Sequence, residues 1–187
     1  MHELIEKDRA LLVFLNNLGN VGSDPFWLLI TGKWIWIPLY IIFLYLLFKT
    51  YKPKSLIFIV VFIALGITFT DQIAGVFKYG IARLRPCHDE ELIPQLRMIT
   101  CGGKYGFFSS HAANSFFIAT FLSILLAKKY RWLPMGVFIW ASFISYSRVY
   151  LGVHFPLDII FGALVGFLSG GLFAEFTKIV LRKQQVI

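Results

Sequence analysis

Five long apolar segments dominate the pattern of hydrophobic and polar positions along this chain. They cover residues 26–48, 55–77, 112–127, 132–147 and 157–179. A transmembrane helix needs about 20 mostly apolar residues, and the two shorter segments extend into the polar motifs beside them. Because the segments are apolar on every helical face, a water-soluble bundle is the less favoured alternative. The pattern predicts an all-α integral membrane bundle of about five transmembrane helices.

The N-terminal segment has a different pattern. Leu4, Leu11, Leu15 and Leu18 fall on one helical face, while charged residues lie mostly off that face. This periodicity predicts an amphipathic helix within residues 1–20 that lies in the membrane interface, with packing on the end of the bundle as an equal alternative. The segment lacks the basic start and the small-residue cleavage site of a signal peptide.

Proline and glycine positions predict how the helices bend and pack. Pro38 lies inside the first apolar segment and is expected to kink it. Gly162, Gly166 and Gly170 form a ridge of small residues on the last segment, which lets another helix approach closely. Packing within one molecule is favoured over dimerisation, and a monomer is therefore slightly favoured. Without internal repeats or low-complexity tracts, residues 1–187 are expected to form one domain.

Composition supports a membrane protein and indicates its orientation. Hydrophobic residues make up 58% of the chain and charged residues 15%, against about 25% charged in soluble domains. The net charge is +8, and one side of the predicted membrane holds nine clustered basic residues with only one acidic residue. We place that side in the cytoplasm of a bacterial inner membrane, facing anionic lipids. The charge indicates no nucleic-acid partner, because no recognition fold accompanies it.

The long segment 78–111 then faces the periplasm or the outside, and it contains both cysteines. An oxidising compartment favours a disulfide between Cys87 and Cys101. Two free thiols are the alternative. A zinc site is less favoured, because only His88 and a few carboxylates lie nearby and no paired cysteine motif is present.

Polar and ionisable residues collect at the outward ends of the second to fifth segments. Placing such residues within a membrane costs free energy, so their presence there usually indicates a functional site. They are Lys78, Arg85, Ser109, Ser110, His111, Arg148, His154 and Asp158. A helix bundle would bring these ends together at one point.

This set of residue types suits phosphoryl transfer without a metal ion. Two arginines and a lysine can surround a multiply charged anion, and the start of a helix at Ser109 and Ser110 adds backbone N–H groups. His154 can attack phosphorus in line while His111 protonates the leaving oxygen. Asp158, four residues after His154, can orient its ring.

The spacing of these residues resembles the three-part signature of the type 2 phosphatidic acid phosphatase superfamily. That signature is K-x6-RP, PSGH and SR-x5-H-x3-D, and the first and third parts match in full. The second part differs at Phe108 and at Ser110, where the family usually has proline and glycine. The resemblance covers about residues 55–175.

The resemblance implies a membrane lipid phosphatase with a phosphohistidine intermediate on His154, His111 as the general acid and Asp158 supporting His154. Lys78, Arg85, Arg148 and Ser109 would hold the phosphate, with no metal or other cofactor. A lipid phosphate is thus the expected partner, together with membrane lipids. Undecaprenyl pyrophosphate is the first candidate, ahead of phosphatidylglycerol phosphate, phosphatidic acid and a lipid A phosphate. A lipid-binding or lipid-moving protein without catalysis is the alternative of another class, but it would not need two histidines. A vanadate-dependent haloperoxidase is disfavoured by the five apolar segments.

Two further charges lie inside the first and second segments. Asp71 is seven residues before Lys78, so both share a helical face. Buried charges need partners, and we expect Asp71 to pair with Lys33 or Arg148. Lys33 could instead extend its ammonium group to the membrane surface.

Overall fold

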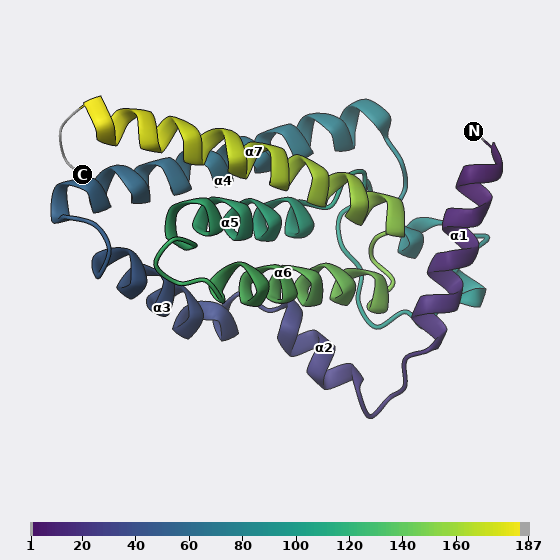
Figure 1. The fold of residues 1–187 in the computed structure, drawn as a ribbon. Coiled ribbons are helices and arrows are strands. Elements are labelled where there is room, and N and C mark those ends of the chain that lie inside the picture. The colour runs from purple at the N-terminus through teal and green to yellow at the C-terminus, as the bar shows by residue number, and fades with distance from the viewer. Residues whose placement is uncertain (1, 184–187) are drawn as a thin grey trace.

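The computed structural model describes residues 2–183, and the predicted domain therefore includes Met1 and residues 184–187, which lie outside the described part. Within that part the fold is all-helical, as predicted, and no strand occurs (Figure 1). The helices are α1 (His2–Asn17), α2 (Asp24–Thr31), α3 (Ile37–Phe48), α4 (Pro53–Ile81), α5 (Ser110–Leu126), α6 (Leu133–Tyr150) and α7 (Pro156–Lys183), with short 3₁₀ turns at Trp34–Trp36, Pro86–His88 and Ile93–Gln95.

Each of the five predicted apolar segments forms helix, but the helices differ in length. Among residues 2–183, α4 and α7 are long and apolar enough to cross a membrane. A third span results if α2 and the segment Trp34–Phe48, which meet at a bend of 70°, count as one. Helix α5 has 17 residues and α6 has 18. The all-α membrane fold is confirmed, while the count of five spans stays a prediction.

The first apolar segment breaks earlier than predicted. Helix α2 ends at Gly32, whose backbone is extended with φ −70° and ψ 144°. Pro38 lies in the first turn of α3, where its missing N–H group leaves no hydrogen bond unmade. The prediction of a kink at Pro38 is therefore wrong. Glycine has a low helix propensity, and it ends one helix so that the proline can begin the next.

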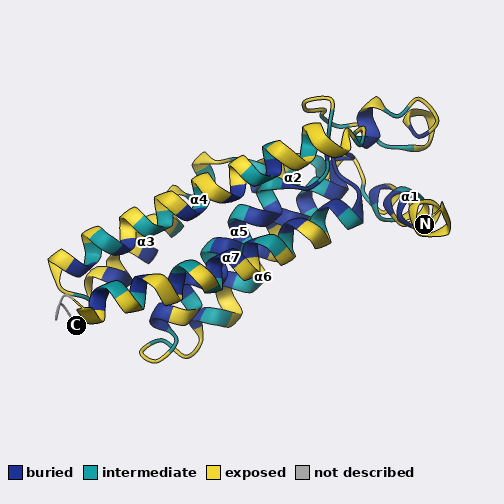
Figure 2. Cartoon of the chain, turned by 90° about the horizontal axis from the view of Figure 1, so that it is seen from above, coloured by how far each residue is buried: buried dark blue, intermediate teal, exposed yellow. Residues whose placement is uncertain are grey.

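Helix α5 is the centre of the bundle. It packs against α4, α6 and α7 and is buried along most of its length, whereas the outer face of α4 is exposed (Figure 2). The glycine ridge of α7 faces α5: a Cβ atom at Gly162 would lie 2.5 Å from the carbonyl oxygen of Ser109, and one at Gly166 would overlap the carbonyl oxygen of Ala113. The ridge packs within the molecule, as predicted.

This contact gives a first prediction about stability. Changing Gly166 to alanine should lower the free energy of unfolding by about 1–3 kcal/mol, because the methyl group can fit only if α5 and α7 move apart. Gly75→Ala in α4 is the matched control, because its methyl group would meet no atom within 4 Å. Thermal unfolding in detergent measures both variants. Equal melting temperatures for Gly166→Ala and the parent protein would contradict the packing.

Helix α1 lies across the end of the bundle where α7 begins (Figure 1). It is buried through Asp8, Leu12 and Asn16, which are spaced four residues apart. Leu4, Leu11 and Leu18, on the predicted apolar face, are exposed. The fourth leucine of that face, Leu15, is half-buried and packs beside Leu12. The structure therefore has α1 packed on the end of the bundle, with the other three leucines facing outward.

Candidate active site

The residues of the three motifs lie at one end of the bundle. Helices α4 and α6 end there and helices α5 and α7 begin there, so three stretches of the chain, near Ile81, near Ser110 and between Tyr150 and Pro156, meet at this end (Figure 1). His111 is close enough to His154, Lys78, Arg85 and Arg148 for direct electrostatic interaction. The two histidines and the three cations therefore belong to one cluster.

His154 and Asp158 form a buried pair, which we call the dyad. His154 is 1% exposed and Asp158 is fully buried. The Nδ1 atom of His154 lies 3.2 Å from Oδ2 of Asp158, which also accepts a hydrogen bond from the backbone N–H of Phe155. An ionised carboxylate at this place requires a proton on Nδ1, so Nε2 keeps the lone pair.

The surroundings of His154 keep its ring neutral. Burial lowers its pKa to about 4, the Asp158 carboxylate partly opposes this shift, and Arg85 and Arg148 lower the pKa further. A neutral imidazole at physiological pH can act as a nucleophile without first losing a proton.

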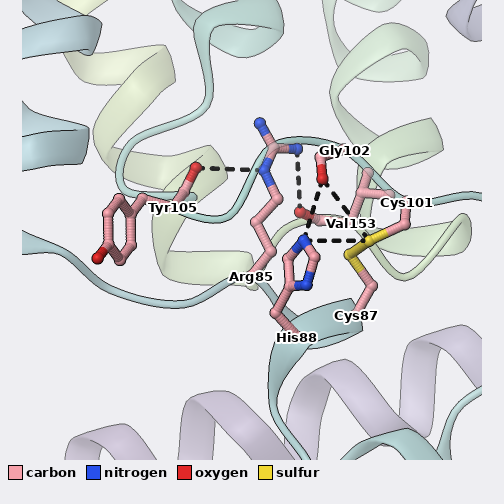
Figure 3. Close-up of a disulfide and its surroundings, with 7 residues drawn as sticks. All are labelled: Arg85, Cys87, His88, Cys101, Gly102, Tyr105 and Val153. Carbon is pink, nitrogen blue, oxygen red and sulfur yellow. Dashed lines mark hydrogen bonds between the residues drawn. A yellow bond between two sulfur atoms is a disulfide. The ribbon is translucent and has the colours of Figure 1, made fainter.

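The three cations of the cluster are held in different ways. Lys78 donates from Nζ to Oγ of Ser110 at 2.7 Å. Arg85 donates to the carbonyl oxygens of Tyr105 and Val153, as Figure 3 shows. Arg148 donates from Nη1 to the hydroxyl of Thr31, and its buried Nε has no acceptor among residues 2–183. Because a buried donor without an acceptor is costly, the Nε atom fits an oxygen of a bound anion.

Ser109 and Ser110 lie at the start of α5 but differ in their contacts. Ser109 is fully buried, and its hydroxyl caps the helix by accepting from the backbone N–H of Ala112. Ser110, at the position where the family usually has glycine, holds the ammonium group of Lys78. Direct binding of phosphate by Ser109 stays a prediction.

The segment between Arg85 and Gly106 packs onto the dyad. Its two ends are joined by backbone hydrogen bonds from Arg85 to Lys104 and from Gly106 to Arg83. A Cβ atom at Gly106 would lie 3.2 Å from Oδ2 of Asp158 and 3.1 Å from Cγ of Arg85, so the chain passes close to both side chains.

Cys87 and Cys101 form a disulfide that closes this segment (Figure 3). His88 lies beside it, with Nε2 3.1 Å from the carbonyl oxygen of Gly102. Loops of this length gain about 3 kcal/mol from closure in the chain-entropy treatment. A reducing agent should therefore lower the melting temperature of the parent protein and leave that of the Cys87→Ser/Cys101→Ser variant unchanged. Equal melting of the parent protein with and without reductant would contradict a stabilising bond.

The partner of Asp71 differs from the prediction. Its carboxylate accepts a hydrogen bond from Nδ2 of Asn114 at 3.0 Å, instead of pairing with Lys33 or Arg148. Asn114 is three residues after His111 on α5, and its carbonyl oxygen accepts from the hydroxyl of Thr70. Asp71 also lies near enough to Lys78, seven residues on along α4, for electrostatic attraction, so the amide and this ammonium group together satisfy the carboxylate. Lys33 is exposed, at the break between α2 and α3.

Sequence reasoning missed two residues beside the dyad, Arg83 and Asp8. Arg83 donates from Nη1 to Oδ1 of Asp158 at 2.9 Å and from Nη2 to Oδ2 of Asp8 at 2.6 Å. Arg83 lies between Lys78 and Arg85 in the K-x6-R motif, and it could have been noticed there as a further cation beside the cluster. Asp8 could have been found from its spacing with Leu12 and Asn16 on one face of α1.

Comparison with known proteins agrees with this geometry. Residues 56–180 match the sequence model of the PAP2 superfamily. A lipid A 4'-phosphatase of Bacteroides thetaiotaomicron is 43% identical over 91% of this chain and 76% of its own length. An undecaprenyl-diphosphatase of Sulfolobus acidocaldarius is 30% identical over 84% of this chain and 65% of its own length.

A solved structure shares the fold. The crystal structure of a transmembrane PAP2 type phosphatidylglycerolphosphate phosphatase from Bacillus subtilis superimposes with a TM-score of 0.75. It is 22% identical and covers 96% of this chain and 89% of its own. The family model, the relatives and the clustered motifs agree, and this chain therefore belongs to the PAP2 superfamily as one of its membrane lipid phosphatases.

Proposed function

We propose that this enzyme removes a phosphate group from a lipid A-type glycolipid, and that the hydrolysis takes place at the outward-facing end of the bundle. The observation that carries the proposal is that His111 of the cluster, with Ser110 beside it, lines a large apolar groove. Lipid A is preferred over the first sequence-based candidate, undecaprenyl pyrophosphate.

The groove lies between α3, α4, α5 and α6 and has a volume of about 600 Å³. Its polar lining includes Ser110, His111, Lys33 and the carboxylate of Asp71, and its apolar lining includes Phe43, Leu47, Ile67, Leu122 and Trp140. An apolar groove of this size suits a hydrocarbon chain. Lys78 contacts Ser110 and Arg148 contacts Thr31, and both partners line the groove. The phosphate of a lipid whose tail occupies the groove would therefore lie beside these two cations.

The preference for lipid A rests on the relatives. The lipid A 4'-phosphatase is 43% identical over nearly the whole chain, whereas the undecaprenyl-diphosphatase is 30% identical over a smaller part. A lipid A phosphate was among the alternatives from the sequence, and it now stands ahead of undecaprenyl pyrophosphate. Phosphatidylglycerol phosphate and phosphatidic acid remain further candidates.

The proposed reaction has two steps. Nε2 of His154 attacks phosphorus, the bond from phosphorus to the lipid oxygen breaks, and His111 gives its proton to that oxygen. Water then attacks the phosphohistidine while His111 takes a proton, and inorganic phosphate leaves. Lys78, Arg85 and Arg148 stabilise the charge on the phosphoryl oxygens in both steps.

We also propose that the cluster faces the periplasm of a bacterial inner membrane. The opposite end of the bundle holds the start of α4, the end of α5 and the end of α7, where the clustered basic residues lie. Basic residues close to span ends favour the cytoplasmic side.

A panel of lipids tests the substrate. Purified enzyme in detergent with a metal chelator is given lipid A carrying both phosphates, undecaprenyl pyrophosphate, phosphatidylglycerol phosphate or phosphatidic acid. We expect the fastest phosphate release from lipid A, with mass spectrometry locating the loss at the 4' position. Faster release from undecaprenyl pyrophosphate would contradict the lipid A assignment, and lipid binding without release from any of the four would favour a non-catalytic protein.

A further inference from the structure

The dyad is connected to the N-terminal helix by a continuous set of charged side chains. Asp8 of α1 accepts from Arg83, Arg83 donates to Asp158, and Asp158 contacts His154, with distances of 2.6, 2.9 and 3.2 Å. Asp8 lies outside residues 56–180, which carry the family match. Asp8, a residue from outside the motifs, is thus connected to the predicted nucleophile His154 through only two side chains, those of Arg83 and Asp158.

Asp8 is held on both of its oxygens. Oδ2 accepts from Nη2 of Arg83, and Oδ1 accepts from the backbone N–H of Leu157 at 2.9 Å. Leu157 precedes Asp158, so Asp8 fixes both the beginning of α7 and the guanidinium group. Its side chain is almost fully buried, which raises its pKa, while Arg83 and the Leu157 N–H oppose that shift. A buried carboxylate held in this way needs the cation beside it.

Arg83 is fixed more firmly than a surface arginine would be. One nitrogen donates to Asp8 and another to Asp158, and the guanidinium carbon lies 3.8 Å from the centre of the Phe155 ring. The guanidinium group can hardly rotate without losing one of these contacts. It holds Oδ1 of Asp158, while the backbone N–H of Phe155 and the ring of His154 hold Oδ2.

Docking of α1 does not depend on Asp8 alone. Arg9, the next residue, forms ion pairs with Asp89 and Glu91 at 3.1 and 2.8 Å. Asn16 donates to the carbonyl oxygens of Arg97 and Tyr150. These contacts join α1 to the rest of the molecule without touching the dyad, so they provide a natural control.

We propose that Asp8 and Arg83 are positioning residues for the dyad, and that α1 is therefore part of the machinery that hydrolyses the lipid phosphate. Arg83 orients the Asp158 carboxylate, but its positive charge also weakens the attraction between that carboxylate and a positive charge on the His154 ring. The negative charge of Asp8 offsets the positive charge of Arg83, so Asp158 can stabilise a positive charge on His154 more strongly. As Nε2 of His154 bonds to phosphorus, the ring becomes positively charged, and Asp158 stabilises that charge.

The inference rests on the proposed phosphatase function, and four variants test it on the preferred lipid phosphate. They are Asp8→Asn, Arg83→Met, the double variant, and Arg9→Gln as the matched control on the same helix. Removing a group that supports a metal-binding side chain typically lowers activity by about 10- to 100-fold, and we take the same range for groups that support the dyad. We expect a loss of this size in kcat for Asp8→Asn with KM within about twofold, because neither residue touches the lipid, and no change for Arg9→Gln.

The double variant separates a linked role from two independent ones. If Asp8 acts through Arg83, adding Asp8→Asn to Arg83→Met should lower kcat no further. Losses that multiply, or a kcat for Asp8→Asn within twofold of the parent, would overturn the inference. If the parent enzyme releases phosphate from no lipid, the proposed function itself fails, and the positioning role falls with it.

The pH dependence of kcat/KM provides a measurement that partial misfolding does not affect. The pH at which kcat/KM falls, on the acid or the alkaline limb of the profile, is independent of the amount of active enzyme. His154 must be neutral to attack, so its pKa in the free enzyme sets the acid limb. The charged groups that face it are Asp158, Arg83 beyond Asp158, Arg85, Arg148 and His111. Asp8→Asn removes a negative charge and should move the limb to lower pH, whereas Arg83→Met removes a positive charge and should move it to higher pH. Shifts in the same direction, or none, would contradict the inference.

Discussion

Replacing His154 by alanine is expected to lower phosphate release from the lipid substrate by about 10⁴-fold or more. The ring is buried, is oriented by Asp158 and keeps its lone pair on Nε2, so it is the predicted nucleophile. No other side chain of the cluster can take its place, because the cations are protonated and His111 has the separate role of moving a proton. The measurement is initial phosphate release from lipid A in detergent.

The control for this prediction is a histidine outside the cluster. His2 is exposed at the start of α1, and His2→Ala should leave turnover unchanged. Thermal unfolding should show that His154→Ala remains folded. A folded His154→Ala variant that keeps a tenth or more of the parent turnover would show that His154 is not the nucleophile.

The second large effect is expected for His111→Ala, and it should depend on the leaving group. A general acid contributes about 10²- to 10⁴-fold when the leaving oxygen needs a proton. The sugar hydroxyl released from lipid A needs one, whereas nitrophenolate leaves without help. The variant should therefore lose most of its activity on lipid A and keep much more of its first-step rate on p-nitrophenyl phosphate.

The first step on p-nitrophenyl phosphate is measured as the initial burst of nitrophenolate in rapid mixing. The second step still needs His111 to take a proton from water, so steady turnover should be slow while the burst remains. A burst reduced as strongly as the lipid A activity would assign His111 to binding or folding instead of proton transfer.

The sequence predicted the helices and the clustered motifs because their signals are local. A run of apolar residues has to form helix in lipid, and motif residues at the ends of neighbouring helices have to meet on one side. The break at Gly32 was missed because the proline at position 38 was the stronger local signal, although proline is well tolerated in the first turn of a helix.

The contacts of charged residues were harder to predict, because they depend on how distant segments pack. Asn114 satisfies Asp71 across α4 and α5, and an amide carries no charge that would single it out in a sequence. Asp8 and Arg83 are 75 positions apart, and only the docking of α1 brings them together. The leucine periodicity of α1 suggested a membrane-facing helix, while the face that packs on the protein is a mixed one formed by Asp8, Leu12 and Asn16.

The substrate could not be ranked from the motifs, because they bind the phosphate group that all candidate lipids share. Under the proposed function, the lipid tail would be recognised by the groove that α3, α4, α5 and α6 line, and no motif residue other than those at the start of α5 lines it. The relatives supplied the information that the motif residues lack.

The most direct test of the account is to find the phosphate on the enzyme during turnover. Substrate with a radiolabelled phosphate is mixed with the parent enzyme and with His111→Ala, the reaction is stopped with alkali, and the labelled peptide is sequenced. The account predicts an acid-labile, alkali-stable label on His154 that accumulates in His111→Ala with p-nitrophenyl phosphate. Turnover by the parent enzyme with no label on His154 in either protein, or with the label on another residue, would contradict it.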